Sequence, residues 1–192
     1  MEKATKQAEL QQLKKQINPH FLFNMLNNAN ILVKDAPDEA SQILEKLDNL
    51  LRYQLNDSTR REVFLTADIQ FLTSFLELEK VRRDHFEYTI FQEGNMENIC
   101  IPPLLFIPFV ENAVKHNLDS DNLSYVHLYF SVHNKQLTFR CENSKPRVPV
   151  KREGGIGLAN VKRRLDLLYE SRYTLQIEDK ETTYNVNLHL NL

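Results

Sequence analysis

The chain has 192 residues, enough for one ordinary domain or two small ones. Its 24 basic and 26 acidic residues leave a net charge of -2, so composition gives no basic field of the kind that binds nucleic acid. The two cysteines, Cys100 and Cys141, fit no metal-ligand spacing and are too few for a disulfide framework. We therefore expect free thiols in a reducing compartment and no direct nucleic-acid partner.

The longest apolar run, residues 99–110, spans only 12 residues and contains three prolines, so it cannot cross a bilayer as a helix. Residues 1–12 are charged and lack the apolar core of a signal peptide. Because a helical pattern starts straight after Met1, we expect this chain to be the soluble part of a longer protein.

The N-terminal third has apolar residues at helical spacing. The pattern predicts one helix over about residues 4–33, kinked at Pro19, and, after a turn at 34–38, a second helix ending near residue 56. Such a hairpin has too little apolar surface to be stable alone, so we expect two copies to pair into a four-helix bundle. Residues 1–61 are thus expected to form a homodimerisation domain.

Residues 62–192 alternate between helical and strand patterns. We expect Thr66 to cap a helix that has Asp68 in its first turn, and the proline pair Pro102 and Pro103 to open another. The predicted fold class is α+β: a helical hairpin followed by a sandwich of a mostly antiparallel sheet with helices on one face. The predicted helices are 66–83, 104–116 and 158–168; the predicted strands are 86–91, 125–132, 136–141, 173–177 and 183–190; and 143–153 is predicted to be a loop.

Three of the four glycines, Gly154, Gly155 and Gly157, fall where a helix is predicted to begin. Glycine lets a backbone approach a ligand closely, and the N–H groups at a helix N-terminus favour an anion such as phosphate. The alternative is a tight turn into a helix with no ligand. The glycines alone favour neither interpretation.

Polar residues also gather at the end of the predicted helix 104–116, where Glu111, Asn112, Lys115 and His116 fall within six positions. An Asn oxygen suits Mg²⁺, which is commonly shared with substrate phosphates, and a lysine neutralises phosphate charge. The alternative is an exposed polar edge on a half-buried helix.

His20 follows Pro19 and precedes the apolar run Phe21, Leu22 and Phe23. A neutral imidazole held on a rigid, partly apolar helix can act as a nucleophile. The alternative, a histidine with no chemistry on an amphipathic helix, is the commoner case.

Three stretches occur in one order: QINPHFLFN at 16–24, PLL at 103–105 with ENAVKH at 111–116, and GIGLANVKRRL at 155–165. Together they resemble the LytS/YehU-like sensor histidine kinases. The resemblance implies a dimerisation and phosphoacceptor hairpin, then an ATP-binding domain of the Bergerat (GHKL) type at 62–192. It further implies that this is the cytosolic portion of a membrane sensor, and that phosphate passes to a response regulator, commonly of the LytTR type.

The resemblance also assigns residues. His20 becomes the phosphoacceptor, Asn112 the Mg²⁺ ligand, and residues 144–154 the lid over ATP. Glu111 is in addition a candidate base for the His20 proton. The remaining assigned residues lie beside the nucleotide: Glu111, Lys115 and His116 in the N-box, and Gly155, Gly157 and Leu158 in the G-box.

Two positions depart from the family pattern. Asn143 stands where Bergerat domains usually have the Asp that binds adenine, and the glycines of that motif are missing; Glu142 is the fallback. Phe21 stands where many histidine kinases have an acidic residue after the phosphorylated histidine. Both departures bear on how well the chain binds and uses ATP.

The leading hypothesis is a histidine kinase that autophosphorylates on His20 with ATP and Mg²⁺. A dimeric pseudokinase scaffold would explain the altered adenine motif, and binding calorimetry with ATP and Mg²⁺ separates it from a kinase. A GHKL ATPase switch would hydrolyse ATP without labelling itself, but the hairpin with His20 argues against it.

Overall fold

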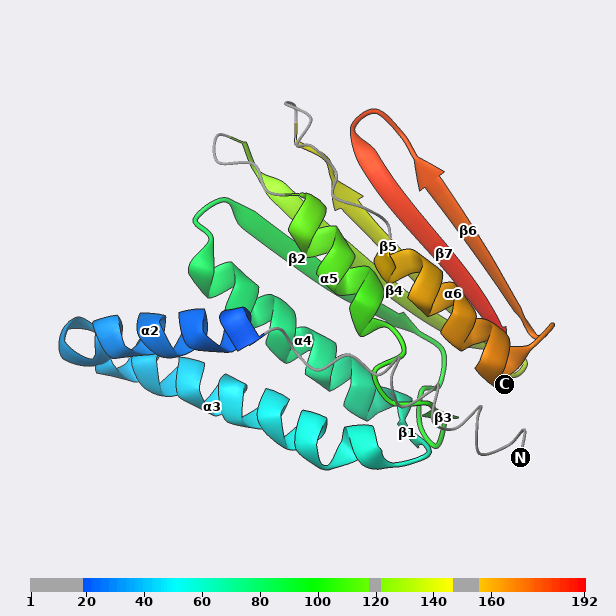
Figure 1. Cartoon of the computed structure of the whole chain (residues 1–192), viewed down its shortest axis with the longest axis horizontal. Coiled ribbons are helices and arrows are strands. Elements are labelled where there is room, and N and C mark those ends of the chain that lie inside the picture. Colours follow the sequence, from blue (N-terminus) through cyan, green and yellow to red (C-terminus); the bar gives the residue numbers. More distant parts are fainter. Residues whose placement is uncertain (1–18, 118–121, 147–155) are drawn as a thin grey trace. The chain divides into compact units, whose positions relative to one another are not determined.

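The structure is a computed structural model that describes residues 19–117, 122–146 and 156–192 (Figure 1). Only the backbone is described for residues 19, 20, 156 and 157. The described residues form two compact units, and the chain crosses between them at 84/85, 96/97 and 105/106. We call residues 19–84 and 97–105 the helical unit, and the described residues of 85–96 and 106–192 the sheet unit.

The helical unit contains α2 (Pro19–Asp35), α3 (Pro37–Leu55) and α4 (Leu65–Arg82). α3 packs against both α2 and α4. Ala36 alone separates the first two helices, so the turn predicted at 34–38 is shorter than expected. Pro37 fits the first helical position, where its missing N–H costs nothing, and Asp38 and Glu39 complement the helix dipole there. The predicted helical hairpin is therefore confirmed from residue 19 onward, whereas the kink at Pro19 concerns residues outside those described.

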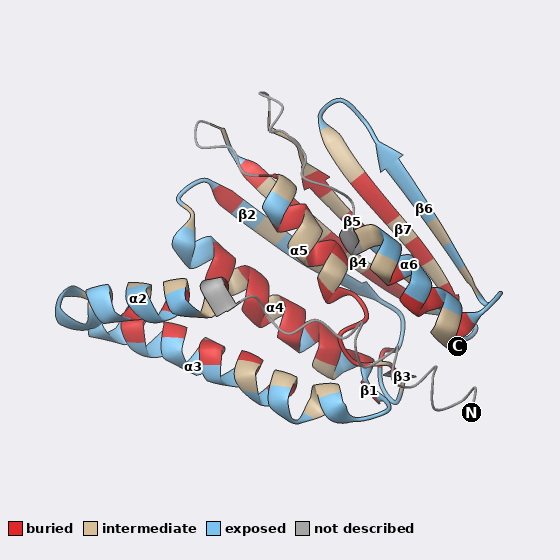
Figure 2. Ribbon diagram, in the orientation of Figure 1, coloured by how far each residue is buried: buried red, intermediate tan, exposed pale blue. Residues whose placement is uncertain are grey.

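The core of the helical unit is aliphatic and aromatic. The Phe21 and Phe75 rings have centroids 5.1 Å apart, and Tyr53 stacks on Phe71 at 4.6 Å. Figure 2 shows the buried positions along one side of α3 and along α4, while much of the outer surface of α2 and α3 is exposed. Fully buried side chains include Met25, Leu50, Leu65, Leu72, Leu76 and Leu78.

The start of α4 differs from the prediction. The helix begins at Leu65, its N-cap residue is Phe64, and no side chain caps it, so Thr66 lies inside the helix and is not its cap. The physical reason is a short pairing that fixes this end instead: β1 (Val63–Phe64) is antiparallel to β3 (Cys100–Ile101). The Leu65 amide also donates to the Ile99 carbonyl oxygen at 2.8 Å.

The sheet unit has five strands in the order β2-β4-β5-β7-β6. Only β2 and β4 are parallel; the other three pairs are antiparallel, as the prediction of a mostly antiparallel sheet requires. Figure 1 shows α5 and α6 on one face of this sheet, which confirms the α+β fold class. The strands and helices of the unit are β2 (Phe86–Glu93), α5 (Ile107–His116), β4 (Ser124–His133), β5 (Gln136–Ser144), α6 (Ile156–Tyr169), β6 (Tyr173–Asp179) and β7 (Thr183–Asn191).

Two predicted boundaries were wrong. The helix expected from Leu104 begins at Ile107, because Leu104 has a φ of +57°, which no right-handed helix accepts. The loop expected from Asn143 begins later, because β5 continues through Ser144 in register with β7. Between the predicted strands 125–132 and 136–141 the chain makes a two-residue turn, in which Asn134 and Lys135 both have positive φ, as type I′ hairpins require.

The domain boundary placed after residue 61 stays a prediction. In the described structure, α4 groups with the hairpin helices, and the segment 97–105 joins them. No described helix is long and apolar enough to cross a membrane.

Candidate functional site

Helix α5 carries the N-box residues, and an aromatic cluster fixes it on the sheet. The Phe106 ring, just before the helix, lies 4.5 Å from Phe139 on β5 and 5.2 Å from Phe130 on β4. Phe109, in the first turn, lies 5.8 Å from Phe139. All four rings are buried. Because aromatic contacts hold its first turn, the direction of α5 is set by the core and not by its polar residues.

The other end of α5 is also fastened. Asn117 follows the helix, is fully buried, and donates from Nδ2 to the Tyr125 carbonyl oxygen on β4 at 3.0 Å. A buried side-chain amide needs hydrogen-bond partners, because leaving its donor or acceptor groups unpaired costs about 1–3 kcal/mol. Sequence reasoning ended its N-box at His116 and missed this residue.

The four predicted N-box residues lie on α5 as expected from their spacing. Glu111, Asn112 and His116 are half-buried and Lys115 is exposed, while Ala113 and Val114 between them are buried in the core. α5 packs against β5, β4 and α6. The structure therefore brings an amide, a carboxylate, an ammonium and an imidazole together on one helix of the sheet unit.

Asn143 lies on the same face of the sheet as α5 and α6. It is 1% exposed, and on β5 it follows the buried Phe139 and Cys141 in strand alternation. Its Nδ2 donates to the Ser144 carbonyl oxygen at 2.8 Å. Asn143, which the sequence resemblance aligns with the adenine-binding Asp of the family, thus points into the layer between sheet and helices.

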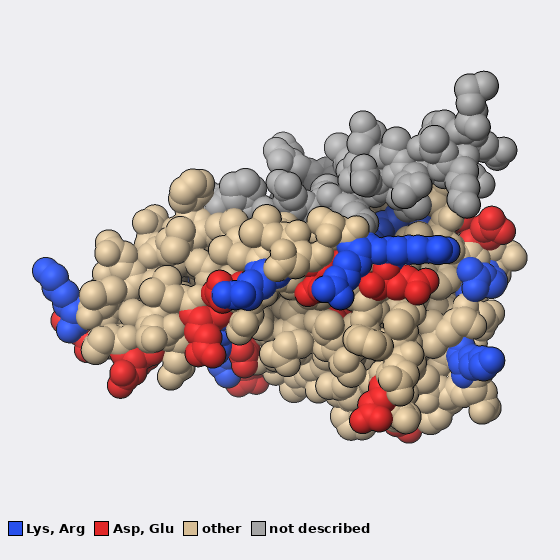
Figure 3. Space-filling view, turned by 90° about the horizontal axis from the view of Figure 1, so that it is seen from below, with Lys and Arg blue, Asp and Glu red and all other residues tan. Residues whose placement is uncertain are grey.

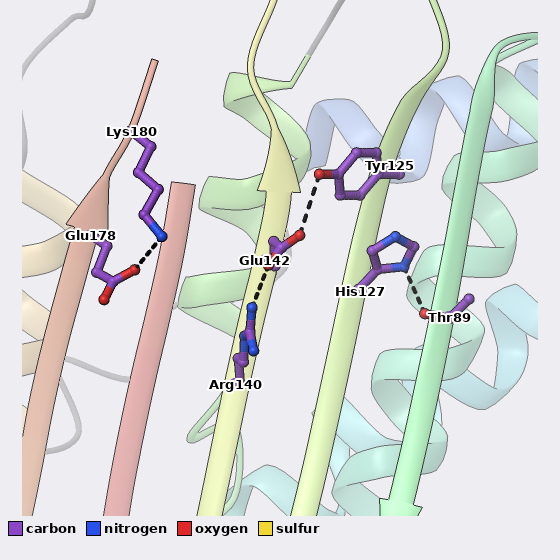
Figure 4. A network of polar contacts seen from close by, with 7 residues as sticks. All are labelled: Thr89, Tyr125, His127, Arg140, Glu142, Glu178 and Lys180. Carbon is purple, nitrogen blue, oxygen red and sulfur yellow. Dashed lines mark hydrogen bonds and ion pairs between the residues drawn. The ribbon is translucent and has the colours of Figure 1, made fainter. Parts of the chain in front are cut away.

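Glu142, the fallback for that role, points to the opposite face. Figure 4 shows its carboxylate receiving a hydrogen bond from the Tyr125 hydroxyl and an ion pair from Arg140, with the helices behind the sheet. His127 and Thr89 form a second contact on this open face, Nδ1 to Oγ1 at 2.7 Å. Partial burial and Glu142 raise the pKa of Tyr125, so its hydroxyl stays a donor. Of the two candidates, only Asn143 lies on the helix side.

The G-box falls at the start of α6. Gly157 lies in the first turn of the helix and Leu158, next to it, is half-buried; Gly155 lies outside the described residues, as does most of the predicted lid. Further along α6, Arg164 is 4% exposed. A buried guanidinium is rare unless it is paired, and sequence reasoning quoted Arg164 only as part of the motif.

His20 lies in the first turn of α2, in the helical unit. The structure describes its backbone alone, so its role as phosphoacceptor stays a prediction, as do the roles of the other assigned residues.

Sequence reasoning placed Asp68 correctly in the first turn of α4 but missed that its side chain is buried. Asp68 is fully buried and accepts hydrogen bonds from the Tyr53 hydroxyl and the Leu104 amide. One signal was present: Asp68 lies three residues after Leu65 and one before Ile69, on the apolar side of α4.

The charges of the surface are mixed. On the face drawn in Figure 3, Lys and Arg lie beside Asp and Glu, and no wide area has a single sign. Among the described residues, no group of three or more His, Cys, Asp or Glu side chains is placed to hold a metal ion. Both cysteines are free thiols, as predicted.

Comparisons with known proteins agree with the sequence resemblance. The family model described as histidine kinase matches residues 8–86. The sensor protein LytS of Staphylococcus haemolyticus is 30% identical over 98% of this chain, and the chain covers 35% of that protein. The sensor histidine kinase YpdA of Escherichia coli is 33% identical over 58% of the chain, which covers 20% of it. The chain thus spans about a third or less of the length of these relatives.

Solved structures agree on the fold. The histidine kinase domain of the blue-light activated kinase of Erythrobacter litoralis matches 98% of this chain and 91% of its own length, with a TM-score of 0.53 and 18% identity. The catalytic domain of histidine kinase ThkA matches 68% of this chain and 93% of its own length, with a TM-score of 0.52 and 15% identity. The chain therefore has the fold of histidine kinase catalytic domains, and over nearly its whole length its sequence is similar to that of the LytS-like sensor histidine kinases.

Proposed function

We propose that this chain is the cytosolic catalytic core of a two-component sensor histidine kinase. It binds ATP with Mg²⁺ in the sheet unit, phosphorylates His20, and passes the phosphoryl group to a response regulator of the LytTR type. The observation that carries the proposal is that the N-box helix α5, the buried Asn143 and the start of α6 lie on one face of one sheet, with α5 packed against both β5 and α6.

The side chains on that face suit a magnesium nucleotide. Asn112 offers a neutral oxygen to Mg²⁺, and Lys115 and His116 offer positive charge and N–H groups to phosphate oxygens. The described residues contain no acidic cluster that would hold a metal by protein ligands alone, which is in keeping with an ion bound mainly through phosphates and water. When bound, Mg²⁺ neutralises charge on the phosphates. Asn143 has the amide chemistry to accept from, and donate to, the adenine edge.

The transfer itself asks little covalent chemistry of the protein. An imidazole nitrogen of His20 uses its lone pair to form the N–P bond while the bond from the γ-phosphorus to the bridging oxygen breaks, and ADP leaves with that electron pair. The proton on the other ring nitrogen goes to a base, for which Glu111 stays our candidate. The protein speeds the transfer by aligning the reacting groups and by neutralising the charge on the phosphates.

We also propose a homodimer, which the surface of the hairpin supports. Five of the six large apolar side chains exposed on α2 and α3 lie at spacings of three, seven and eleven residues, which put them on one side of each helix; the sixth, Ile31, lies off this side. Apolar stripes of this kind are covered when two hairpins form a four-helix bundle. The exposed residues on these stripes are Phe23, Leu26 and Val33 on α2, and Leu44 and Leu55 on α3.

The lengths of the relatives support a location for this core. Proteins named sensor protein or sensor histidine kinase are about three or more times as long as the part that matches here. We propose that the rest of this protein contains a membrane-bound sensor and that this chain lies on its cytosolic side.

A dimeric scaffold without kinase activity is the second candidate, and one observation favours it. β5 runs through Ser144 without a glycine, and Asn143 replaces the usual Asp, so the adenine site is built differently from the family pattern.

The test is labelling with ATP radiolabelled at the γ-phosphate in the presence of Mg²⁺. A kinase gives acid-labile label that is lost in His20→Gln and in Asn112→Ala, while both variants keep the circular dichroism spectrum of the parent. Label that survives His20→Gln contradicts the proposal. Absence of both label and heat in calorimetry with ATP and Mg²⁺ establishes the scaffold instead.

A further inference from the structure

Asp68 on α4 joins two segments that are far apart in the sequence. Its carboxylate is fully buried and accepts a hydrogen bond from the Tyr53 hydroxyl on α3. The same oxygen, Oδ1, accepts from the Leu104 backbone amide at 3.0 Å. Burying a carboxylate is unfavourable unless hydrogen-bond donors compensate for the lost water. These hydrogen bonds therefore connect α3, α4 and the 97–105 segment at one buried point, which we call the Asp68 joint.

The backbone at Leu104 has a strained conformation that surrounding contacts must hold in place. Leu104 has a φ of +57° and is buried. For a residue with a side chain, this left-handed conformation is unfavourable, and it persists only where surrounding contacts impose it. The hydrogen bond to Asp68 is such a contact.

Leu104 lies three residues before α5, and the chain crosses from the helical unit to the sheet unit between Leu105 and Phe106. α5 itself is held in the sheet unit by other means, namely the aromatic cluster around Phe139 and the bond from Asn117 to Tyr125. The Asp68 joint is thus on the covalent path into the N-box helix without being part of what folds that helix.

We propose that Asp68 is a positioning residue, which fixes the tether between the hairpin helices and the N-box helix by holding the Leu104 amide. The inference rests on the proposed kinase activity. Transfer between a bound nucleotide and His20 requires near-attack geometry, and a slack tether lowers the fraction of time spent in it. The Asp68 joint therefore affects the rate of phosphoryl transfer to His20, whereas the affinity for the nucleotide depends on the sheet unit.

The Tyr53 hydroxyl is suited to its part in the Asp68 joint. Burial, with the adjacent Asp68, raises the pKa of Tyr53 above its ordinary value, so the hydroxyl keeps its proton and remains a donor. The ring stacks on Phe71, which Tyr53→Phe preserves. That variant removes only the oxygen that links α3 to Asp68.

The experiment compares Tyr53→Phe with Thr73→Val. Thr73 is on the same helix as Asp68, and its hydroxyl donates only locally, to the Ile69 carbonyl oxygen at 2.9 Å. Both variants therefore remove one hydroxyl at almost constant shape. Two quantities are measured on the full chain: the single-turnover rate of label transfer at saturating ATP, and the dissociation constant of a fluorescent ATP analogue.

We expect Tyr53→Phe to lower the transfer rate at least fivefold with the dissociation constant within twofold of the parent, and Thr73→Val to change neither. Asp68→Ala is expected to lose more of the rate and to speed hydrogen exchange of the Leu104 amide at least tenfold, while Asp68→Asn, which keeps an acceptor oxygen, retains most of the rate. Equal rates in the parent and Tyr53→Phe, or parallel loss of rate and affinity, would overturn the inference. A parent protein without label would instead refute the proposed function.

Discussion

Asn117 and Tyr125 are joined by a hydrogen bond from the Asn117 amide nitrogen to the Tyr125 carbonyl oxygen, at 3.0 Å and with Asn117 fully buried. The bond fastens the C-terminal end of α5 to β4, directly after Lys115 and His116. The helix that carries the proposed phosphate-binding side chains is therefore anchored at both ends, by the aromatic cluster at its start and by an amide at its finish.

Removing the hydrogen bond between Asn117 and Tyr125 tests whether the C-terminal end of α5 belongs to the nucleotide site. Asn117→Ala leaves the Tyr125 carbonyl without its donor in a buried place, so we expect the free energy of unfolding to fall by about 1–3 kcal/mol. Because Lys115 and His116 lose their support, ATP is also expected to bind several times more weakly. Urea unfolding and calorimetry measure the two effects. Unchanged ATP affinity in a destabilised variant would show that the end of α5 is not part of the nucleotide site.

The fold followed from the sequence where patterns were local. The hairpin helices, the five strands of the sheet in outline and the α+β class come from periodicities of 3.6 and 2, which one stretch of sequence carries by itself. Leu104 and Thr66 were misassigned because long-range contacts decide their backbone: Asp68 holds Leu104, and the pairing of β1 with β3 fixes the start of α4. No local sequence pattern indicates either of these two contacts.

The site was predictable to a similar degree. The N-box residues fell on one helix as their spacing required. The contacts of Asn117 and Asp68 were missed because they are made with residues on other elements, and only the place of Asp68 on the apolar side of α4 indicated that it is buried. The choice between Asn143 and Glu142 also needed the sheet, since adjacent residues of a strand face opposite sides.

The choice between Asn143 and Glu142 as the adenine-binding residue can be tested with a pair of variants. Asn143→Leu removes the amide from the helix side at similar volume, and we expect ATP to bind about tenfold more weakly, the equivalent of about 1.4 kcal/mol. Glu142→Gln changes the open face, where the side chain contacts Tyr125 and Arg140, and should leave ATP affinity unchanged. Calorimetry on both variants decides. The reverse order of effects would move adenine recognition to Glu142.

The dimer depends on the exposed apolar stripes of the hairpin. Leu44 is 46% exposed in the single chain, and Leu44→Lys places a charge where a second hairpin would pack. We expect sedimentation equilibrium to show the parent as a dimer and this variant as a monomer at micromolar concentration. Gln42→Lys, an exposed neighbour on the same helix, is the control and should remain dimeric. Dimers of equal strength in all three proteins would place the interface elsewhere.

The two thiols are expected to differ in reactivity. Cys141 is buried on β5, and burial raises the pKa of its thiol to about 12, so almost none of it is thiolate at pH 8. Cys100 is exposed. Iodoacetamide at pH 8 should therefore alkylate Cys100 in the folded protein and reach Cys141 only after unfolding, as peptide mass spectrometry can follow. Equal rates for the two thiols in the folded state would contradict the buried position of β5.

The phosphorylated residue decides the central claim. After incubation with ATP and Mg²⁺, the protein is digested at neutral to alkaline pH, where phosphohistidine survives, and its peptides are mapped by mass spectrometry. The account predicts one phosphate, on His20, in the peptide that carries the start of α2. Phosphate on any other residue, or none in a protein shown to bind ATP, would contradict it.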